Sequence, residues 1–161
     1  MKKQIGIVVI TTVITVGIVV VALIYLMPTL GPRYLHPLMM GDQPAPTDLD
    51  FSVERLSDEG VFRVSWVSDP AAPPLNTIHT WSLHVETADG KAVENAEITV
   101  DGGMPQHGHG LPTSPQVTEN LGNGDYLVEG LKFQMPGWWE VRFSITAEGQ
   151  TDSITFNLTL E

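Results

Sequence analysis

The amino-acid sequence predicts an all-β protein built as an antiparallel β-sandwich, and three observations support this prediction. From about Asp50 to Glu161, apolar residues recur at every second position in short runs, which is the period of half-buried strands. Clusters of Gly, Pro, Asn and Asp separate the runs and predict turns. No stretch after Met27 combines a helical period with helix caps. We therefore expect residues 50–161 to form one β-domain.

Seven or eight of these runs are candidate strands. They cover residues 50–55, 62–66, 77–86, 98–100, 116–121, 126–133, 139–145 and 154–160. In the third run His79 lies on the inward, mostly apolar face, whereas His84 lies on the polar face. Short strands separated by turns at this spacing predict a sandwich of immunoglobulin-like type. The stretch from Leu121 to Tyr126 resembles the turn that sets a tyrosine corner in such sandwiches.

The N-terminal region is predicted to anchor this domain in a membrane. Residues 5–27 form a run of 23 residues without a charge, and a helix of that length covers the roughly 30 Å hydrocarbon core of a bilayer. The run is longer than a signal-peptide core, and no small-residue cleavage site follows it, which favours an uncleaved anchor. Lys2 and Lys3 place residues 1–4 in the cytoplasm. Residues 28–49, rich in Pro and Gly, then form a linker to a domain outside the cytoplasm.

Charge and composition exclude several classes of function. The 19 acidic residues all follow the anchor, whereas only six of the eight basic residues do, so this part carries a formal net charge of 6 − 19 = −13. Nucleic acid is a poor partner for so acidic a domain. The absence of cysteine excludes thiolate nucleophiles, iron–sulfur clusters and cysteine zinc sites. Because no nucleophile elbow or phosphate-binding glycine motif is present, we expect that the protein is not an enzyme.

The most informative stretch runs from Asp101 to Pro115 and holds four glycines, three prolines, two histidines and a methionine. We expect it to be a pinned loop that neither forms a helix nor continues a sheet ladder. It presents Met104, His107 and His109, a soft thioether and two imidazoles, within six residues. These side chains predict a metal site with copper as the first candidate. The alternative is a shaped turn whose histidines face water.

The number and the type of the candidate ligands bear on whether copper or zinc would bind. His107 and His109 are two residues apart, so they face the same way in an extended segment. Together with the Met104 thioether they suit a low-coordinate copper(I) ion. Zinc would require a fourth ligand, for which His79 is the candidate. His79 is alternatively a hydrogen-bonded plug at the end of the core.

Five segments of this sequence resemble the FixH-like and YtkA-like exported domain families, whose sandwich fold is similar to that of CopC-like proteins. They are Leu75-Asn-Thr-Ile-His-Thr-Trp81, residues 89–100, Gly103-Met-Pro-Gln-His-Gly-His-Gly110, Gly124-Asp-Tyr126 and Phe133-Gln-Met-Pro-Gly-Trp-Trp-Glu-Val141. The resemblance covers about Phe51 to Glu161. It implies a single-pass protein of the bacterial inner membrane with its domain on the periplasmic side. It also implies copper handling connected with the assembly of a respiratory oxidase.

Two functions therefore remain open. One is an anchored accessory domain that binds copper through His107, His109, Met104 and His79 and serves a membrane respiratory or metal-transport complex. The alternative is an interaction module without a metal that docks on such a complex. Because Trp139 fits the inward face of its strand, Trp138 is expected to point outward and to be a candidate for partner binding. The alternative is that Trp138 is tucked under a neighbouring loop.

Overall fold

The computed structural model describes residues 45–161, which form nine β-strands and no helix. The strands are β1 (Glu54–Leu56), β2 (Phe62–Asp69), β3 (His79–Thr87), β4 (Glu97–Met104), β5 (His109–Gly110), β6 (Gln116–Gly122), β7 (Asp125–Leu131), β8 (Gly137–Ala147) and β9 (Gln150–Leu160). The predicted all-β class is confirmed. The expected cytoplasmic end, the anchor and the linker up to residue 44 lie outside the described residues.

Within residues 45–161, no helix is long and apolar enough to cross a membrane.

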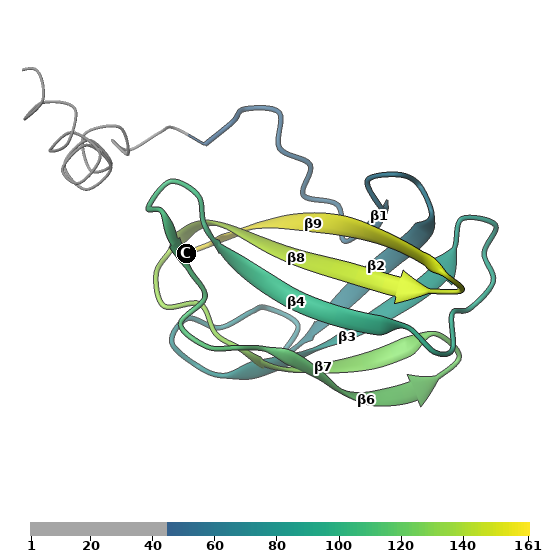
Figure 1. The fold of residues 1–161 in the computed structure, drawn as a ribbon. Helices are drawn as coiled ribbons and strands as arrows, with labels where there is room; N and C mark the ends of the chain where they lie inside the picture. The colour runs from purple at the N-terminus through teal and green to yellow at the C-terminus, as the bar shows by residue number, and fades with distance from the viewer. Residues whose placement is uncertain (1–44) are drawn as a thin grey trace, which may run out of the picture. The chain divides into compact units, whose positions relative to one another are not determined.

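The strands form two antiparallel sheets (Figure 1). The first sheet has the order β1-β2-β3-β7-β6, and the second has the order β5-β4-β8-β9. The chain crosses from one sheet to the other three times, through the connections 88–96, 111–115 and 132–136. All pairs of neighbouring strands are antiparallel. The predicted pairing of antiparallel strands in two sheets is therefore confirmed.

One hydrophobic core fills the space between the sheets, because alternate residues of the long strands face inward. These residues are Phe62, Val64, Trp81, Leu83, Val85, Trp139, Val141, Phe143, Ile145, Ile154, Phe156, Leu158 and Leu160. The inward faces predicted from the period of two are thus confirmed. The run near Asp50 differs from the prediction, since the strand begins only at Glu54 and Phe51 is half exposed.

The prediction that the stretch from Asp101 to Pro115 leaves the sheet is wrong for its first half. β4 continues to Met104, and β5 pairs with its end to form a hairpin. Two glycines allow β4 to approach both of its neighbours, β8 and β5, closely. A Cβ at Gly102 would lie 2.5 Å from the carbonyl oxygen of Glu140, and one at Gly103 would lie 2.6 Å from that of His109. Glycine therefore permits the strand here, because any larger residue would push the neighbouring backbone away.

Tyr126 joins the two sheets at one end of the sandwich. Its hydroxyl donates to the carbonyl oxygen of Val93 at 2.6 Å and accepts from the amide of Ala96 at 2.9 Å. Both partners lie in the connection 88–96, at least 30 residues upstream. A tyrosine corner bonds only a few residues upstream. The structure therefore shows the expected bond from tyrosine to backbone, but over a longer range.

Candidate functional site

The hairpin of β4 and β5 carries three of the predicted ligands. β4 ends at Met104, and the amides of His107 and Gly108 both donate to the Met104 carbonyl oxygen at 3.0 Å. Gly108 has a φ of 66°, which glycine adopts without strain. The turn therefore reverses the chain within four residues and sets His109 opposite Met104 in the ladder.

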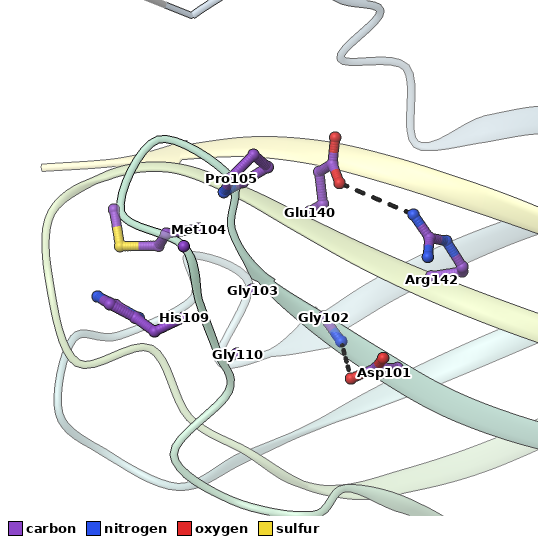
Figure 2. A pocket seen from close by; sticks show the side chains of 10 residues that line it. Asp101, Gly102, Gly103, Met104, Pro105, His109, Gly110, Glu140 and Arg142 are labelled. Carbon is purple, nitrogen blue, oxygen red and sulfur yellow. Dashed lines mark hydrogen bonds and ion pairs between the residues drawn. The ribbon is translucent and has the colours of Figure 1, made fainter. Parts of the chain in front are cut away.

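The two loop histidines lie close together and are exposed. The ring centroids of His107 and His109 are 5.8 Å apart, and the ring planes differ by 19°. Because Met104 and His109 are directly paired, their side chains leave the hairpin on the same side. Figure 2 shows the Met104 thioether and the His109 ring next to each other. The structure thus places Met104, His107 and His109 on one hairpin, with the Met104 side chain buried and both imidazoles exposed.

Two residues that were not predicted as site residues, Gln134 and Trp139, lie beside the His109 ring. The edge of its ring meets Trp139, with centroids 6.4 Å apart and planes at 63°. Its Nδ1 lies 3.5 Å from the side-chain nitrogen of Gln134. Gln134 and Trp139 both lie in the segment Phe133–Val141. The resemblance of this segment to the FixH-like and YtkA-like domains is the feature of the sequence that could have pointed to these two residues. With Nδ1 facing Gln134, the Nε2 atom of His109 is the one left to bind a metal.

Met104 is the buried member of the three, with 1% of its surface exposed. Its terminal methyl would lie 3.0 Å from a Cβ placed at Gly137, so the absence of a side chain at Gly137 makes room for the thioether. Met104 also belongs to the main core cluster. The thioether is therefore fixed by packing, whereas the two imidazoles are free to change rotamer.

A shallow hollow of about 300 Å³ lies next to this group and is lined by Met104 and His109 (Figure 2). Its floor is glycine backbone from β4 and β5, because these residues have no side chains to fill it. On its far side Arg142 pairs with Glu140 at 3.9 Å. Glu140 and Arg142 lie on the outer face of the second sheet, whereas the Met104 side chain is buried on its inner face.

His79 lies at the start of β3 in the first sheet, whereas the loop histidines lie on the hairpin of the second sheet. It is buried, its Nδ1 lies 3.2 Å from the Thr77 carbonyl oxygen, and its ring contacts Phe133 with centroids 5.4 Å apart. Burial lowers the pKa of His79, and the hydrogen bond to Thr77 offsets this in part. Its Nε2 is buried without a hydrogen-bond partner among the described residues. These contacts are those of a neutral histidine that closes one end of the core.

Within residues 45–161, no group of three or more His, Asp or Glu residues is placed to hold a metal ion. The candidate ligand set is therefore the pair His107 and His109 with the neighbouring thioether, and His79 is not drawn into it. Two imidazoles and one thioether match the ligand number and softness of copper(I) more closely than those of zinc.

The expected exposure of Trp138 is wrong, because only 8% of its surface is accessible. Its indole Nε1 donates to the side-chain oxygen of Asn157 on β9 at 3.0 Å. The amide nitrogen of Asn157 in turn donates to the Asp50 carbonyl oxygen at 3.0 Å. The segment that precedes β1 thus passes beside Trp138 on the outer face of the second sheet. Strand alternation predicted the direction of this side chain, and the alternative of a covering loop is the one that the structure shows.

A second group of polar side chains lies on the outer face of the first sheet. Nδ1 of His84 lies 2.6 Å from Asp125 and its Nε2 lies 3.3 Å from Glu86. His84 and Asp125 are cross-strand partners in β3 and β7. Partial burial acts to lower the pKa of His84, but the hydrogen bonds to Asp125 and Glu86 outweigh it and raise that pKa. No local pattern in the sequence predicts this group, because Asp125 is 41 residues away from His84.

The His84 group predicts a contribution to stability that depends on pH. Because the folded pKa of His84 is raised, its contribution is fully present below the unfolded pKa of about 6.5 and is lost as pH rises through the folded value. Urea unfolding of wild type and His84→Ala at pH 6 and pH 9 should show a gap of about 0.5–1 kcal/mol at the lower pH only. An equal gap at both values would contradict the ion-pair explanation.

Comparison with known proteins gives one family. No curated protein matches the chain. Among solved structures, the ZirS C-terminal domain is similar, with 15% sequence identity, a TM-score of 0.35, and coverage of 73% of this chain and 82% of that one. The model of the YtkA-like family matches residues 56–144, which is more than half of the chain and includes β2 to β7 and the hairpin. The chain therefore belongs to the YtkA-like family.

Proposed function

We propose that this protein is an exported accessory domain that binds one copper(I) ion through His107, His109 and Met104. The observation that supports this is the hairpin of β4 and β5, which sets two exposed imidazole rings 5.8 Å apart and pairs His109 with Met104. A thioether beside two imidazoles favours the soft monovalent ion over zinc. Since the rings lie face to face, binding requires rotation of at least one ring, which the exposure of both permits.

The proposed setting is the periplasmic side of a bacterial inner membrane. The apolar run of residues 5–27 supports an anchor, and membership of the YtkA-like family supports an exported domain. The strand order supports an immunoglobulin-like sandwich. Without the short strands β1 and β5, the sheets become β2-β3-β7-β6 and β4-β8-β9, which in chain order is the ABED and CFG arrangement. Copper would be buffered or delivered there for a respiratory oxidase or a metal-transport complex.

Competition with a copper(I) chelator tests the site. The full-length chain should take one copper(I) from the chelator, whereas His107→Ala combined with His109→Ala should take none. Met104→Leu keeps the buried volume and removes the sulfur, so it should weaken copper(I) binding by about tenfold or more. His84→Ala is the matched control, because it removes a histidine on another sheet and should bind as wild type does.

Two results would contradict the copper site. One is equal competition by wild type and the double variant, which would leave the hairpin as a structural turn. The other is equal affinity at pH 5 and pH 7.5. Because imidazoles bind metal only when neutral, the affinity for copper(I) should fall in acid.

The alternative function, docking without a metal, is supported by the exposure of the histidines and by the apolar side chains of Val67 and Ile78, which are 67% and 63% exposed. Because Trp138 is buried, it does not support docking through the outer face of β8. A chain that binds no copper but still associates with membrane complexes would favour this alternative.

A further inference from the structure

One edge of the second sheet lacks a neighbouring strand over most of its length. β4 pairs with β8 from Glu97 to Gly103, but on its other side β5 reaches only Gly103 and Met104. Leu111 adds one backbone hydrogen bond to Gly102. Among the described residues, no strand therefore pairs with the outer edge of β4 from residue 97 to 101. Such an edge presents backbone donors and acceptors that another extended chain can use.

Two hollows follow this edge, and together we call them the β4–β6 groove. One, of about 490 Å³, lies between residues 98–101 and residues 113–117. The other, of about 420 Å³, lies between residues 95–97 and residues 117–120 with Tyr126. They share Val117, so they are continuous along the side of the sandwich where β4 of one sheet and β6 of the other lie (Figure 1).

The floor of the β4–β6 groove is apolar. Ile98, Val100 and Val117 are half-buried and pack against the main core cluster. Ile98 and Val100 are two residues apart on β4, so both face the space between the sheets. An extended segment beside β4 would set every second side chain against this floor, which is how alternate positions provide specificity in strand addition.

The walls of the groove carry charge of one sign. The charged residues that line the two hollows are Glu97, Asp101 and Glu119, and all are acidic. Among the described residues, none of these three carboxylates takes part in an ion pair. The cross-strand neighbour of Asp101 is Arg142, and Arg142 pairs with Glu140 instead. A second copy of this chain would bring the same carboxylates together and is disfavoured. A basic occupant would find complementary charge.

We propose that the β4–β6 groove binds an extended, basic segment of a partner protein as an added strand beside β4. The segment alternates apolar residues, which contact Ile98, Val100 and Val117, with Lys or Arg residues near Glu97, Asp101 and Glu119. This interaction is separate from the copper site and does not require a metal.

The probe is the synthetic peptide Lys-Val-Lys-Val-Lys-Val-Lys added to the full-length chain, with the acidic analogue Glu-Val-Glu-Val-Glu-Val-Glu as control. The basic peptide should bind and should slow amide hydrogen exchange in residues 97–101, whereas the acidic one should do neither. Replacing Glu97, Asp101 and Glu119 together by Lys should weaken binding by at least about tenfold. The matched control, with Asp48, Glu59 and Glu161 replaced by Lys, should bind as wild type does.

Two N-methylated peptides separate strand addition from simple charge attraction. In a strand paired along one edge, alternate amides point toward β4. Methylation of either the valine amides or the lysine amides should therefore abolish binding, while methylation of the other set leaves it unchanged. Equal binding by both methylated peptides, or no protection at residues 97–101, would overturn the proposal.

Two further measurements complete the test. Protection, without peptide, of the amides of residues 97–101 that point away from β8, together with a dimer in sedimentation, would also overturn the proposal and assign the edge to a second copy. The variant His107→Ala with His109→Ala should bind the basic peptide normally, so failure of the copper site and failure of the groove are distinguishable.

Discussion

Replacing Trp81 with alanine should lower the free energy of unfolding by about 3–5 kcal/mol, the largest loss that we expect from one substitution in this domain. Trp81 is fully buried and stacks on Trp66, with ring centroids 3.9 Å apart and planes 9° apart. It also contacts Phe133 and Phe143, each at a centroid distance of 6.3 Å. Alanine would leave a cavity between the sheets that these rings cannot close without leaving their rotamers.

The measurement is urea unfolding followed by circular dichroism, with Trp81→Phe as the matched control. The indole Nε1 of Trp81 is buried without a hydrogen-bond partner among the described residues, so phenylalanine removes an unpaired polar group as well as volume. Trp81→Phe should therefore cost less than half as much as alanine. A loss below about 1 kcal/mol for Trp81→Ala would show that the two tryptophans do not fill the core as described.

Replacing Asp152 with alanine should lower the free energy of unfolding by about 2–3 kcal/mol. Asp152 is buried at the start of β9 and accepts from the amides of Glu59 at 3.0 Å, Val61 at 3.3 Å and Ser153 at 2.7 Å. Two of these amides belong to the turn between β1 and β2, so one carboxylate ties that turn to the second sheet. Alanine would leave the amides without their acceptor.

The contribution of Asp152 should depend on pH with a sign opposite to that of His84. Burial acts to raise the pKa of Asp152, but hydrogen bonds from Ser57, Ser153, Val61 and Glu59 outweigh it and hold that pKa below its ordinary value. The contribution is therefore present above the unfolded pKa of about 3.9 and is lost as pH falls through the folded value. Unfolding at pH 7 and pH 2.5 should show a gap between wild type and Asp152→Ala that shrinks in acid. A gap that stays constant would contradict this origin.

The inward faces of the long strands were determined by the sequence itself. In β8 and β9 a polar residue follows nearly every apolar one, and this period of two fits only a strand with one buried face. Trp139, Phe143 and Phe156 lie at the apolar positions of this alternation, and all three are buried. Met104, His107 and His109 were likewise expected within one loop, and they lie on one hairpin because a single turn joins residues so close in sequence.

Tertiary structure decided the features that depend on a neighbouring strand. Composition predicted that Gly102 and Gly103 would leave the sheet, yet they lie in β4. Glycine is required at both positions, because the carbonyl oxygens of Glu140 and His109 approach too closely for a side chain. Trp138 points outward as alternation requires, but Asn157 and the segment before β1 cover it. The group around His84 and the open edge of β4 depend on strand order and register. A local pattern specifies which way a side chain points, whereas the partner that it meets is set by pairing between residues far apart in the chain.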